Sequence, residues 1–484
     1  MNKIRDKQQH PNVEIAVHNF GPIFEATIDL RPLTVFIGPS NTGKTYFSML
    51  LYTLHKAFDG FSGFPNYLIQ DLLGEIVYVW DDQPSEAQKE SLPIFKKLNT
   101  EGQPFKFSDL PQELRDEVQV YIKDPPILLN QLESCLDINS PSDMRKSTGG
   151  IRNETAISVE VSEENQKFWD FKMTVTESDT IVHSSVDQNM PLSSGDEPRS
   201  DERFGLNSYL RSLNRLNKNS GEIYYLPAAR SGIMQSHTVI ASSLVARSTR
   251  AGFERSAEVP LFPGGMSDFL QKIILYKADK NPNSEMMVIA DALESSVLYG
   301  KLIWRPSPSG YPEFLYYSWE MEEEIRLSQA SSMVSELAPL VLFIRGLIRP
   351  GDTLIIEEPE AHLHPGAQTE IAATLARLVR AGVRVVVTTH SDWLLKEIGN
   401  LIREGVLKEK GELRKKPHRP ESWLLPDEVG AWHFYKEKPV EPLHFTNIDG
   451  IEPPDYEELA LNLYNRSAGL HNQIEETEGD NTSE

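Results

Sequence analysis

One stretch of the sequence decides the fold: LTVFIGPSNTGKT, from Leu33 to Thr45. Its last eight residues fit the pattern G-x-x-x-x-G-K-[ST] of a phosphate-binding loop, whose glycines let backbone N–H groups surround phosphate oxygens. The loop consists of Gly38, Pro39, Ser40, Asn41, Thr42, Gly43, Lys44 and Thr45. An apolar strand precedes it, and a helix with an apolar side follows. The sequence therefore predicts a phosphate site at the amino end of this helix.

Two acidic residues follow a second apolar strand, in the segment LIIEEP that begins at Leu354. In a phosphate-loop fold the neighbouring strand delivers its acids to the metal and to the attacking water. We expect Glu357 to hold Mg²⁺, directly or through water, and Glu358 to polarise the nucleophilic water. In the loop itself, Lys44 would reach the β- and γ-phosphates of ATP, and Thr45 would give its hydroxyl oxygen to Mg²⁺.

His390 stands at the end of a third apolar strand, 383–389. An imidazole ring can both donate and accept a hydrogen bond, so this histidine can contact the γ-phosphate. A histidine at a strand end is by itself more often an ordinary polar residue. The ordered set of phosphate loop, acid pair and histidine favours a catalytic role beside Glu358.

The final third of the sequence alternates between helices and strands. Strands and helices that alternate in this way indicate a parallel sheet with crossover connections, and therefore an α/β fold. The expected elements are a helix at 333–347, a strand at 353–356, a helix at 365–381, a strand at 383–389 and a helix at 392–403. Strands are also expected at 13–17, 24–30 and 33–37, and a hairpin at 156–161 and 168–175.

At this point the sequence resembles a known family. The segments IIEEPEAHLHPGAQ, from Ile355, and VVVTTHSDWLL, from Val385, are similar to ABC-type ATPases of the SMC and OLD groups. More narrowly, they resemble the stand-alone prokaryotic members found beside effector genes, including antiphage-defence ATPases. The resemblance covers roughly 11–58 and 220–450. It implies an ABC-type ATPase head with a mixed sheet. It also implies that two such heads sandwich two ATP molecules between them.

The resemblance also implies a signature loop that completes the ATP site of the other protomer. The candidate is SQASSMVSE, from Ser328, because it lies ahead of a long apolar helix. Met333 stands where family members usually have glycine, so Ser332 is the expected contact in trans. The alternative is a simple helix N-cap by Ser331 or Ser332. The glutamine-bearing loop of the family has no distinct match; Gln103, Gln112 and Gln119 are candidates.

Three smaller features also bear on the interpretation. His362 and His364 form an H-x-H pair, which we interpret as packing and hydrogen bonding near the ATP site rather than as metal ligands. Arg230, in the segment YYLPAAR, is either structural or faces the nucleotide. The single cysteine, Cys135, excludes a disulfide framework and a Cys-rich zinc site, and we expect it to be a packing residue.

Composition limits the partners. Lys and Arg total 48 against 71 Asp and Glu, which gives a formal net charge of −23 and argues against a general polyanion binder. The basic stretch Lys408–Arg419 could still contact nucleic acid locally, or could be a solvated loop. No segment approaches the roughly 18 apolar residues of a membrane span, and the polar N-terminus has no signal-peptide pattern. We expect a soluble cytoplasmic protein.

The motifs divide the chain into an ATPase head interrupted by mostly helical insertions. The expected parts are the loop-bearing portion of the head at 1–58, a helical insertion at 59–150, strands and a helix of the head at 151–252 with a disordered loop at 177–203, a second helical insertion at 253–300, the rest of the head at 301–470, and a disordered acidic tail at 471–484.

Several functions are compatible with such a head. The first is a switch ATPase whose ATP-driven dimer, or higher homo-oligomer, controls a separately encoded effector such as a nuclease or toxin, with slow or regulated turnover. The others are an SMC-like DNA-repair or chromosome-maintenance ATPase, and an ATP-dependent scaffold with little turnover. A fused metal-dependent nuclease of the OLD type is rejected, because no D-x-D pair on strand-like sequence follows His390.

Overall fold

The structure is a computed structural model of the 484-residue chain. It describes residues 11–58, 60–61, 108, 112, 115–116, 126–148, 151–163, 166–187, 221–248, 263–277, 283–306, 311–413, 421–446 and 450–481. Residues 188–220 of the expected head portion and most of the expected insertion at 59–150 lie outside the described residues.

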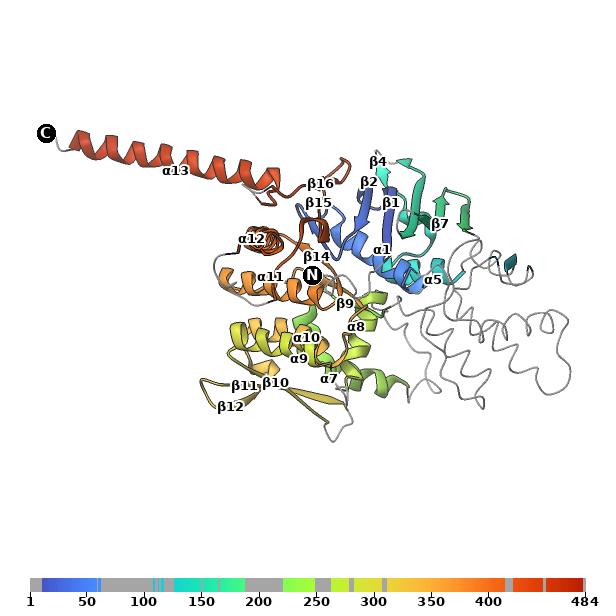
Figure 1. The fold of residues 1–484 in the computed structure, drawn as a ribbon, viewed down its shortest axis with the longest axis horizontal. Helices are drawn as coiled ribbons and strands as arrows, with labels where there is room; N and C mark the ends of the chain where they lie inside the picture. Colours follow the sequence, from blue (N-terminus) through green and yellow to red (C-terminus); the bar gives the residue numbers. More distant parts are fainter. Residues whose placement is uncertain are drawn as a thin grey trace.

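A six-stranded sheet forms the centre of the molecule, in the order β16-β15-β3-β14-β13-β9 (Figure 1). All neighbours pair in parallel except β15 and β16. The predicted parallel sheet and the α/β fold are therefore confirmed, and the antiparallel edge makes the sheet mixed. The strands are β3 (Leu33–Ile37), β9 (Ile223–Leu226), β13 (Thr353–Glu357), β14 (Arg384–Thr389), β15 (Val429–His433) and β16 (Glu441–Leu443).

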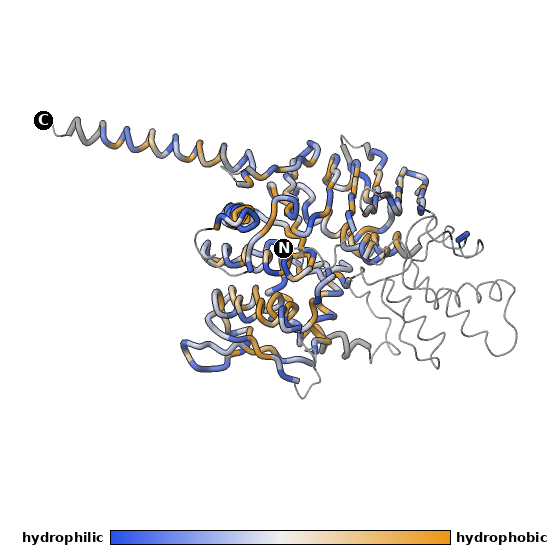
Figure 2. Tube along the Cα trace, viewed as in Figure 1, coloured by the Kyte–Doolittle hydropathy of each residue, from blue (hydrophilic) through white to orange (hydrophobic). Residues whose placement is uncertain are grey.

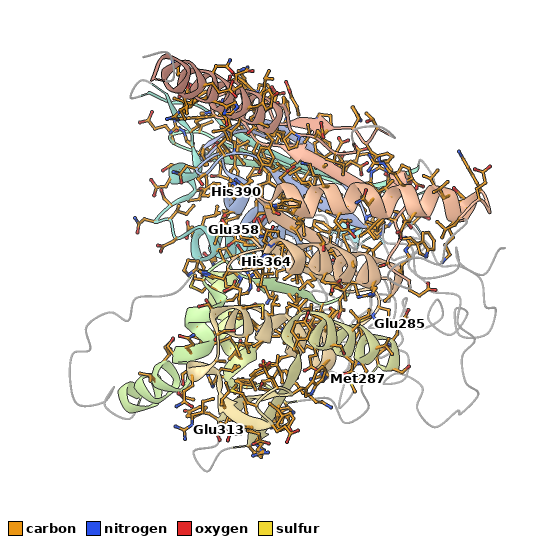
Figure 3. The ribbon with its side chains drawn as sticks, turned by 90° about the vertical axis from the view of Figure 1, so that its left-hand side faces the viewer. Glu285, Met287, Glu313, Glu358, His364 and His390 are labelled. Atoms are coloured by element: carbon orange, nitrogen blue, oxygen red, sulfur yellow. The ribbon has the colours of Figure 1, made fainter. Side chains whose placement is uncertain are left out.

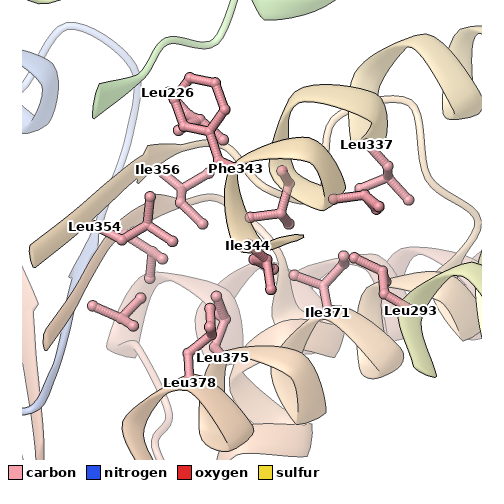
Figure 4. Packing of buried hydrophobic residues seen from close by; sticks show 14 of the residues in the cluster. Leu226, Leu293, Leu337, Phe343, Ile344, Leu354, Ile356, Ile371, Leu375 and Leu378 are labelled. Carbon is pink, nitrogen blue, oxygen red and sulfur yellow. The ribbon is translucent and has the colours of Figure 1, made fainter. Parts of the chain in front are cut away.

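Side chains that alternate along the central strands divide the core into two clusters. Leu354 and Ile356 of β13 face one cluster, whereas Ile355 faces the other. Figure 4 shows the first cluster, in which Phe343 and Leu375 meet β13 from two different helices. Helices on this side are α7 (Arg230–Ser248), α10 (Ser332–Gly346), α11 (Pro365–Arg380) and α12 (Asp392–Glu409).

The second cluster lies between the central sheet and a five-stranded antiparallel sheet of order β2-β1-β6-β7-β8. Helix α1 (Lys44–Ala57) contributes its apolar side here, and α5 (Pro126–Leu136) packs against α1. The strands are β1 (Asn12–Phe20), β2 (Ile23–Leu30), β6 (Thr155–Glu163), β7 (Gln166–Val175) and β8 (Thr180–Val186), with a small β4–β5 pair at Ser147–Thr148 and Ile151–Arg152. The expected hairpin of 156–161 and 168–175 is confirmed as β6 and β7.

Strand β8 corrects the expectation of a disordered loop from 177. The outer edge of β7 offers unpaired backbone groups, and every residue of β8 pairs with a residue of β7. Side chains add to this pairing, because Asp170 accepts hydrogen bonds from the backbone and the hydroxyl of Ser185. Residues 188–203 of the expected loop lie outside the described residues.

The segment 253–300 was expected to be an insertion, yet its described helices pack into the first cluster. Phe269 and Ile273 of α8 (Gly264–Ile274) and Leu293 of α9 (Ser284–Leu293) are buried there with the helices around β13. A π-helical turn at Glu294–Leu298 directly follows α9. A three-stranded antiparallel sheet follows, with β10 (Gly300–Pro306), β11 (Pro312–Ser318) and β12 (Glu323–Arg326).

A single long helix, α13 (Pro454–Asn481), ends the described chain and projects away from the body of the molecule (Figure 1). It corrects the expectation of a disordered tail from 471. The sequence here is rich in Leu and Glu, which are good helix formers, and its only proline stands at the first helical position. Apolar and polar residues alternate along it (Figure 2). Among the described residues, no helix has the length and apolar character needed to cross a membrane.

Candidate nucleotide-binding and catalytic site

The predicted phosphate loop connects β3 to α1, where backbone geometry requires its glycines. Gly38 and Gly43 have φ angles of +131° and +104°, which side-chain-bearing residues rarely adopt. A Cβ at Gly38 would lie 2.3 Å from the carbonyl oxygen of Phe434, and one at Gly43 would lie 2.4 Å from Cγ1 of Ile23. No side chain caps the start of α1. The first N–H groups of the helix are therefore free to bind a ligand, as in other anion-binding helix termini.

Lys44 is folded back over the loop. Its ammonium group donates hydrogen bonds to the carbonyl oxygens of Gly38 and Pro39, each at 2.7 Å. The side chain is buried, and this burial lowers the pKa of Lys44 to about 8, although Glu358 and Glu360 act in the opposite direction. Thr45, one residue later, is exposed in the first turn of α1. The lysine is thus a poorly solvated cation, which a phosphate anion can stabilise.

Glu357 is the last residue of β13 and is buried. Its Oε2 atom accepts a hydrogen bond of 3.2 Å from the backbone N–H of Ala228. Its Oε1 atom is buried and has no hydrogen-bond partner of acceptable geometry among the described residues. Burial and the charge of Glu357 raise the pKa of the neighbouring Tyr225 hydroxyl, which therefore stays protonated. A buried carboxylate at a strand end, with the Tyr225 hydroxyl as a polar neighbour, suits a hard cation, so this residue fits the expected Mg²⁺ ligand.

The register of β13 and β14 brings Glu358 and His390 together. Glu357 pairs with Thr388, and the N–H of Glu358 donates to the Thr388 carbonyl at 2.9 Å. Beyond the strand ends, Nε2 of His390 lies 3.9 Å from Oε1 of Glu358, and both side chains are partly exposed. Figure 3 shows the two residues on the same side of the molecule, with His364 below them. The predicted acid and histidine therefore share one surface beside the phosphate loop.

His390 has a lowered pKa. Burial is the main cause, and the positive charge of Lys44 acts in the same direction, whereas Glu358 opposes both. The imidazole is therefore neutral at neutral pH and can donate or accept a hydrogen bond.

Two residues that sequence reasoning did not single out hold the backbone of His390. Oε1 of Glu360 accepts hydrogen bonds of 2.7 Å from the N–H of His390 and from the hydroxyl of Thr389. The hydroxyl of Tyr456, in the first turn of α13, donates to the carbonyl of His390 at 2.7 Å. Glu360 belongs to the quoted motif and so had a signal of its own. Tyr456 lies in a helix far along the chain and had none.

Of the two interpretations of Arg230, the structure supports the structural role. Its side chain is buried and forms an ion pair of 2.7 Å with the buried Glu336. It also donates to the backbone carbonyls of Glu357 and Glu358, at 2.5 and 3.0 Å. The arginine therefore fixes the backbone at Glu357 and Glu358.

The expected signature residue lies at a helix start. Ser332 is exposed at the first position of α10, and the side chain of Ser331 accepts the N–H of Val334 as an N-cap. The capping alternative therefore holds for Ser331, and Met333 packs against the first core cluster. Similarly, His364 caps α11 by accepting the N–H of Gly366. Within the described residues, no group of three or more His, Cys, Asp and Glu is placed to hold a metal ion.

Other sequence candidates have structural surroundings or lie outside the described residues. Lys408 lies over the ring of Trp423, with its ammonium group 4.5 Å from the centroid. The rest of the basic stretch, 414–419, is outside the described residues, as are Gln103 and Gln119. Cys135 is a buried free thiol, as expected for a packing residue.

The family model of the AAA ATPase domain matches residues 13–395, which is most of the chain. The chain belongs to this family. Membership accounts for the phosphate loop and makes ATP the expected nucleotide of this ATPase. No curated protein matches the chain.

Among solved structures, three SMC head domains are similar to this chain. An SMC head bound to the C-winged helix domain of ScpA is 10% identical, covers 90% of this chain and 98% of its own, and has a TM-score of 0.37. The head from Thermotoga maritima is 9% identical over 90% of this chain and 100% of its own, with a TM-score of 0.36. A Pyrococcus furiosus head with an extended coiled coil, bound to the C-terminal domain of ScpA, is 10% identical over 95% and 100%, with a TM-score of 0.36.

Proposed function

We propose that this ATPase-family chain hydrolyses ATP with Glu358 as general base, and that hydrolysis reopens a dimer of heads that ATP has closed. The closed dimer would control a separately encoded effector, in the antiphage-defence setting that the sequence resemblance implies. The observation that carries the catalytic part is the cluster at the sheet edge. Glu358 and His390 approach to 3.9 Å beside a lysine whose pKa is lowered to about 8.

The residues of the site divide the chemistry between them. Lys44 exchanges its two loop carbonyls for oxygens of the β- and γ-phosphates, and it regains full charge in doing so. Glu358 is partly exposed and can accept a proton from a water molecule that attacks the γ-phosphate. His390, neutral at neutral pH, donates a hydrogen bond to a γ-phosphate oxygen.

The donor set fits Mg²⁺, which prefers oxygen ligands and keeps several waters when it binds nucleotide phosphates. Glu357 offers a buried carboxylate at the end of β13, and Thr45 offers an exposed hydroxyl at the start of α1. When bound there with ATP, the ion would neutralise charge that develops on the β- and γ-phosphates.

Dimer closure supplies the contact that one head lacks. Ser332 is exposed at the amino end of α10, where helix N–H groups favour an anion. We assign it to the γ-phosphate of ATP held by a second protomer. Slow turnover follows if hydrolysis waits for this closure.

Single-turnover hydrolysis with the Glu358→Gln variant tests the proposal. Loss of a general base should lower the rate by about 10²- to 10⁴-fold, while ATP binding is retained. ATP should then hold the variant as a dimer in light scattering. The matched control is Glu313→Gln, a partly exposed acid that Figure 3 shows far from Glu358, at the lower end of the molecule. Equal rates for Glu358→Gln and wild type would contradict the catalytic role and favour the scaffold.

A further inference from the structure

Helix α13 begins at the catalytic site, although most of its length projects away from it. Its first turn carries Tyr456, whose hydroxyl donates to the carbonyl oxygen of His390 at 2.7 Å. The ring of Tyr456 packs against the edge of the first core cluster. Burial and the charge of Asp455 raise the pKa of Tyr456 to about 12, so the phenol remains a donor across the working pH range.

With this contact, both backbone groups of His390 are hydrogen-bonded to side chains. Glu360 accepts the N–H of His390, and Tyr456 donates to its C=O. Since the two backbone groups of a residue lie on either side of its Cα, holding both restricts the direction in which the side chain leaves the chain. The imidazole must point toward Glu358 and the phosphate to act, so its direction matters for the rate.

The first turn of α13 is itself anchored beside the phosphate loop. Oδ1 of Asp455 lies 2.9 Å from Nε2 of His433, which is buried at the end of β15. In the sheet, His433 pairs with Ile37, the residue immediately before Gly38. The same carboxylate contributes to the electrostatic environment of Lys44. The position of Tyr456 is therefore fixed relative to β15 and β3, and β3 leads directly into the phosphate loop.

We propose that Tyr456 is a positioning residue for hydrolysis: its hydroxyl fixes the His390 backbone and so couples the seating of α13 to the catalytic centre. The inference rests on the catalytic role proposed for His390. Tyr456 acts through His390 and touches no phosphate. Any displacement of the projecting helix that lifts its first turn would loosen the histidine.

The Tyr456→Phe variant of the full chain isolates the hydroxyl, because it keeps the ring and its packing. A neutral hydrogen bond of this kind contributes about 0.5–1.5 kcal/mol, so kcat should fall about 2- to 10-fold. KM for ATP should stay within about 2-fold, and the melting temperature should fall by no more than about 3 °C, because only one hydrogen bond is lost while the phosphate loop and the core are untouched. Tyr464→Phe, an exposed tyrosine on the same helix, is the matched control and should retain the wild-type kcat.

A double-mutant cycle with His390→Gln separates this inference from the proposed function. If Tyr456 acts through the histidine, Tyr456→Phe should have little further effect on kcat in the His390→Gln background. Equal losses in both backgrounds, an unchanged kcat in Tyr456→Phe alone, or a fall in melting temperature of more than about 3 °C with a rise in KM would each overturn the positioning role. A wild-type kcat in His390→Gln alone would instead refute the proposed role of His390.

Discussion

The edge of the central sheet that carries Glu358 and His390 and the projecting part of α13 differ in which side chains they bury. At the edge, buried charged groups form ion pairs and hydrogen bonds. Arg230, for example, pairs with Glu336 and donates hydrogen bonds to two backbone carbonyls. On α13, large apolar side chains are exposed to solvent, and Tyr464 is 72% exposed. The other exposed apolar residues of the helix are Leu459, Leu461, Leu463, Leu470 and Ile474.

The contrast shows that residue type does not determine the contribution of a side chain to stability. A buried charge is costly to leave without its partner, because water cannot replace the lost contact. An exposed leucine contributes little, because its surroundings in the folded chain resemble those in the unfolded chain. We therefore expect substitutions at the edge to have large effects, and substitutions on α13 to have small ones.

The largest effect is expected for Arg230→Met. The change leaves Glu336 as an unpaired buried charge, which should lower the free energy of unfolding by about 3–5 kcal/mol. The matched control is Arg305→Met, which removes an exposed ion pair of 2.6 Å with Glu324 and should cost less than about 1 kcal/mol. Denaturant unfolding of the two variants measures the difference. Equal losses would mean that the edge is not held by its buried ion pair.

Next in size is the effect of Lys44→Ala on ATP binding. Loss of the charged hydrogen bonds to phosphate should weaken ATP binding about 100-fold. The control is Lys56→Ala, at the far end of the same helix, where the lysine pairs with Asp268. Titration calorimetry with ATP compares the two variants. If Lys56→Ala bound as weakly as Lys44→Ala, the effect would come from α1 as a whole and not from the loop.

A smaller effect is expected from pH. The pKa of Lys44 is lowered to about 8 without nucleotide, and bound phosphates must raise it. Because the charged form binds ATP, affinity should fall as pH rises above about 8, by at most tenfold for each pH unit. Binding at pH 8.5 should take up a proton, which calorimetry in buffers of different ionisation enthalpy detects. Proton uptake that persists in Lys44→Ala would assign it to another group.

The smallest effect is expected on α13. Leu463→Ala should change the free energy of unfolding by less than about 0.5 kcal/mol, because the side chain is exposed. Leu340→Ala, the same substitution at a buried position of α10, should cost about 2–5 kcal/mol. A large loss for Leu463→Ala in denaturant unfolding would show that α13 is covered in solution and would remove the contrast.

Local patterns were sufficient for much of the fold and the site. The phosphate loop, the two acids at the end of β13 and the histidine after β14 were all predicted from neighbouring residues. Each is a short motif at the end of an apolar strand, and parallel strands bring such ends to one edge. The alternation of helices and strands in the final third predicted the central sheet for the same reason.

Patterns failed where a partner far along the chain decides the structure. Strand β8 forms because β7 offers an open edge, and the helices of 264–293 enter the core because their apolar faces meet α10. The tail from 471 was predicted from its charge to be disordered, yet helix propensity carries α13 to Asn481.

The sequence by itself thus determined which groups make up the candidate site: a phosphate loop, two carboxylates and a histidine. Only the tertiary structure decided how these groups are held. Arg230 carries the backbone of the acids, Glu360 accepts the N–H of His390, and Tyr456 meets its carbonyl from α13. The physical reason is that a motif records chemistry within a few neighbouring residues, whereas a hydrogen bond between distant segments exists only once the sheet and helices have been packed together.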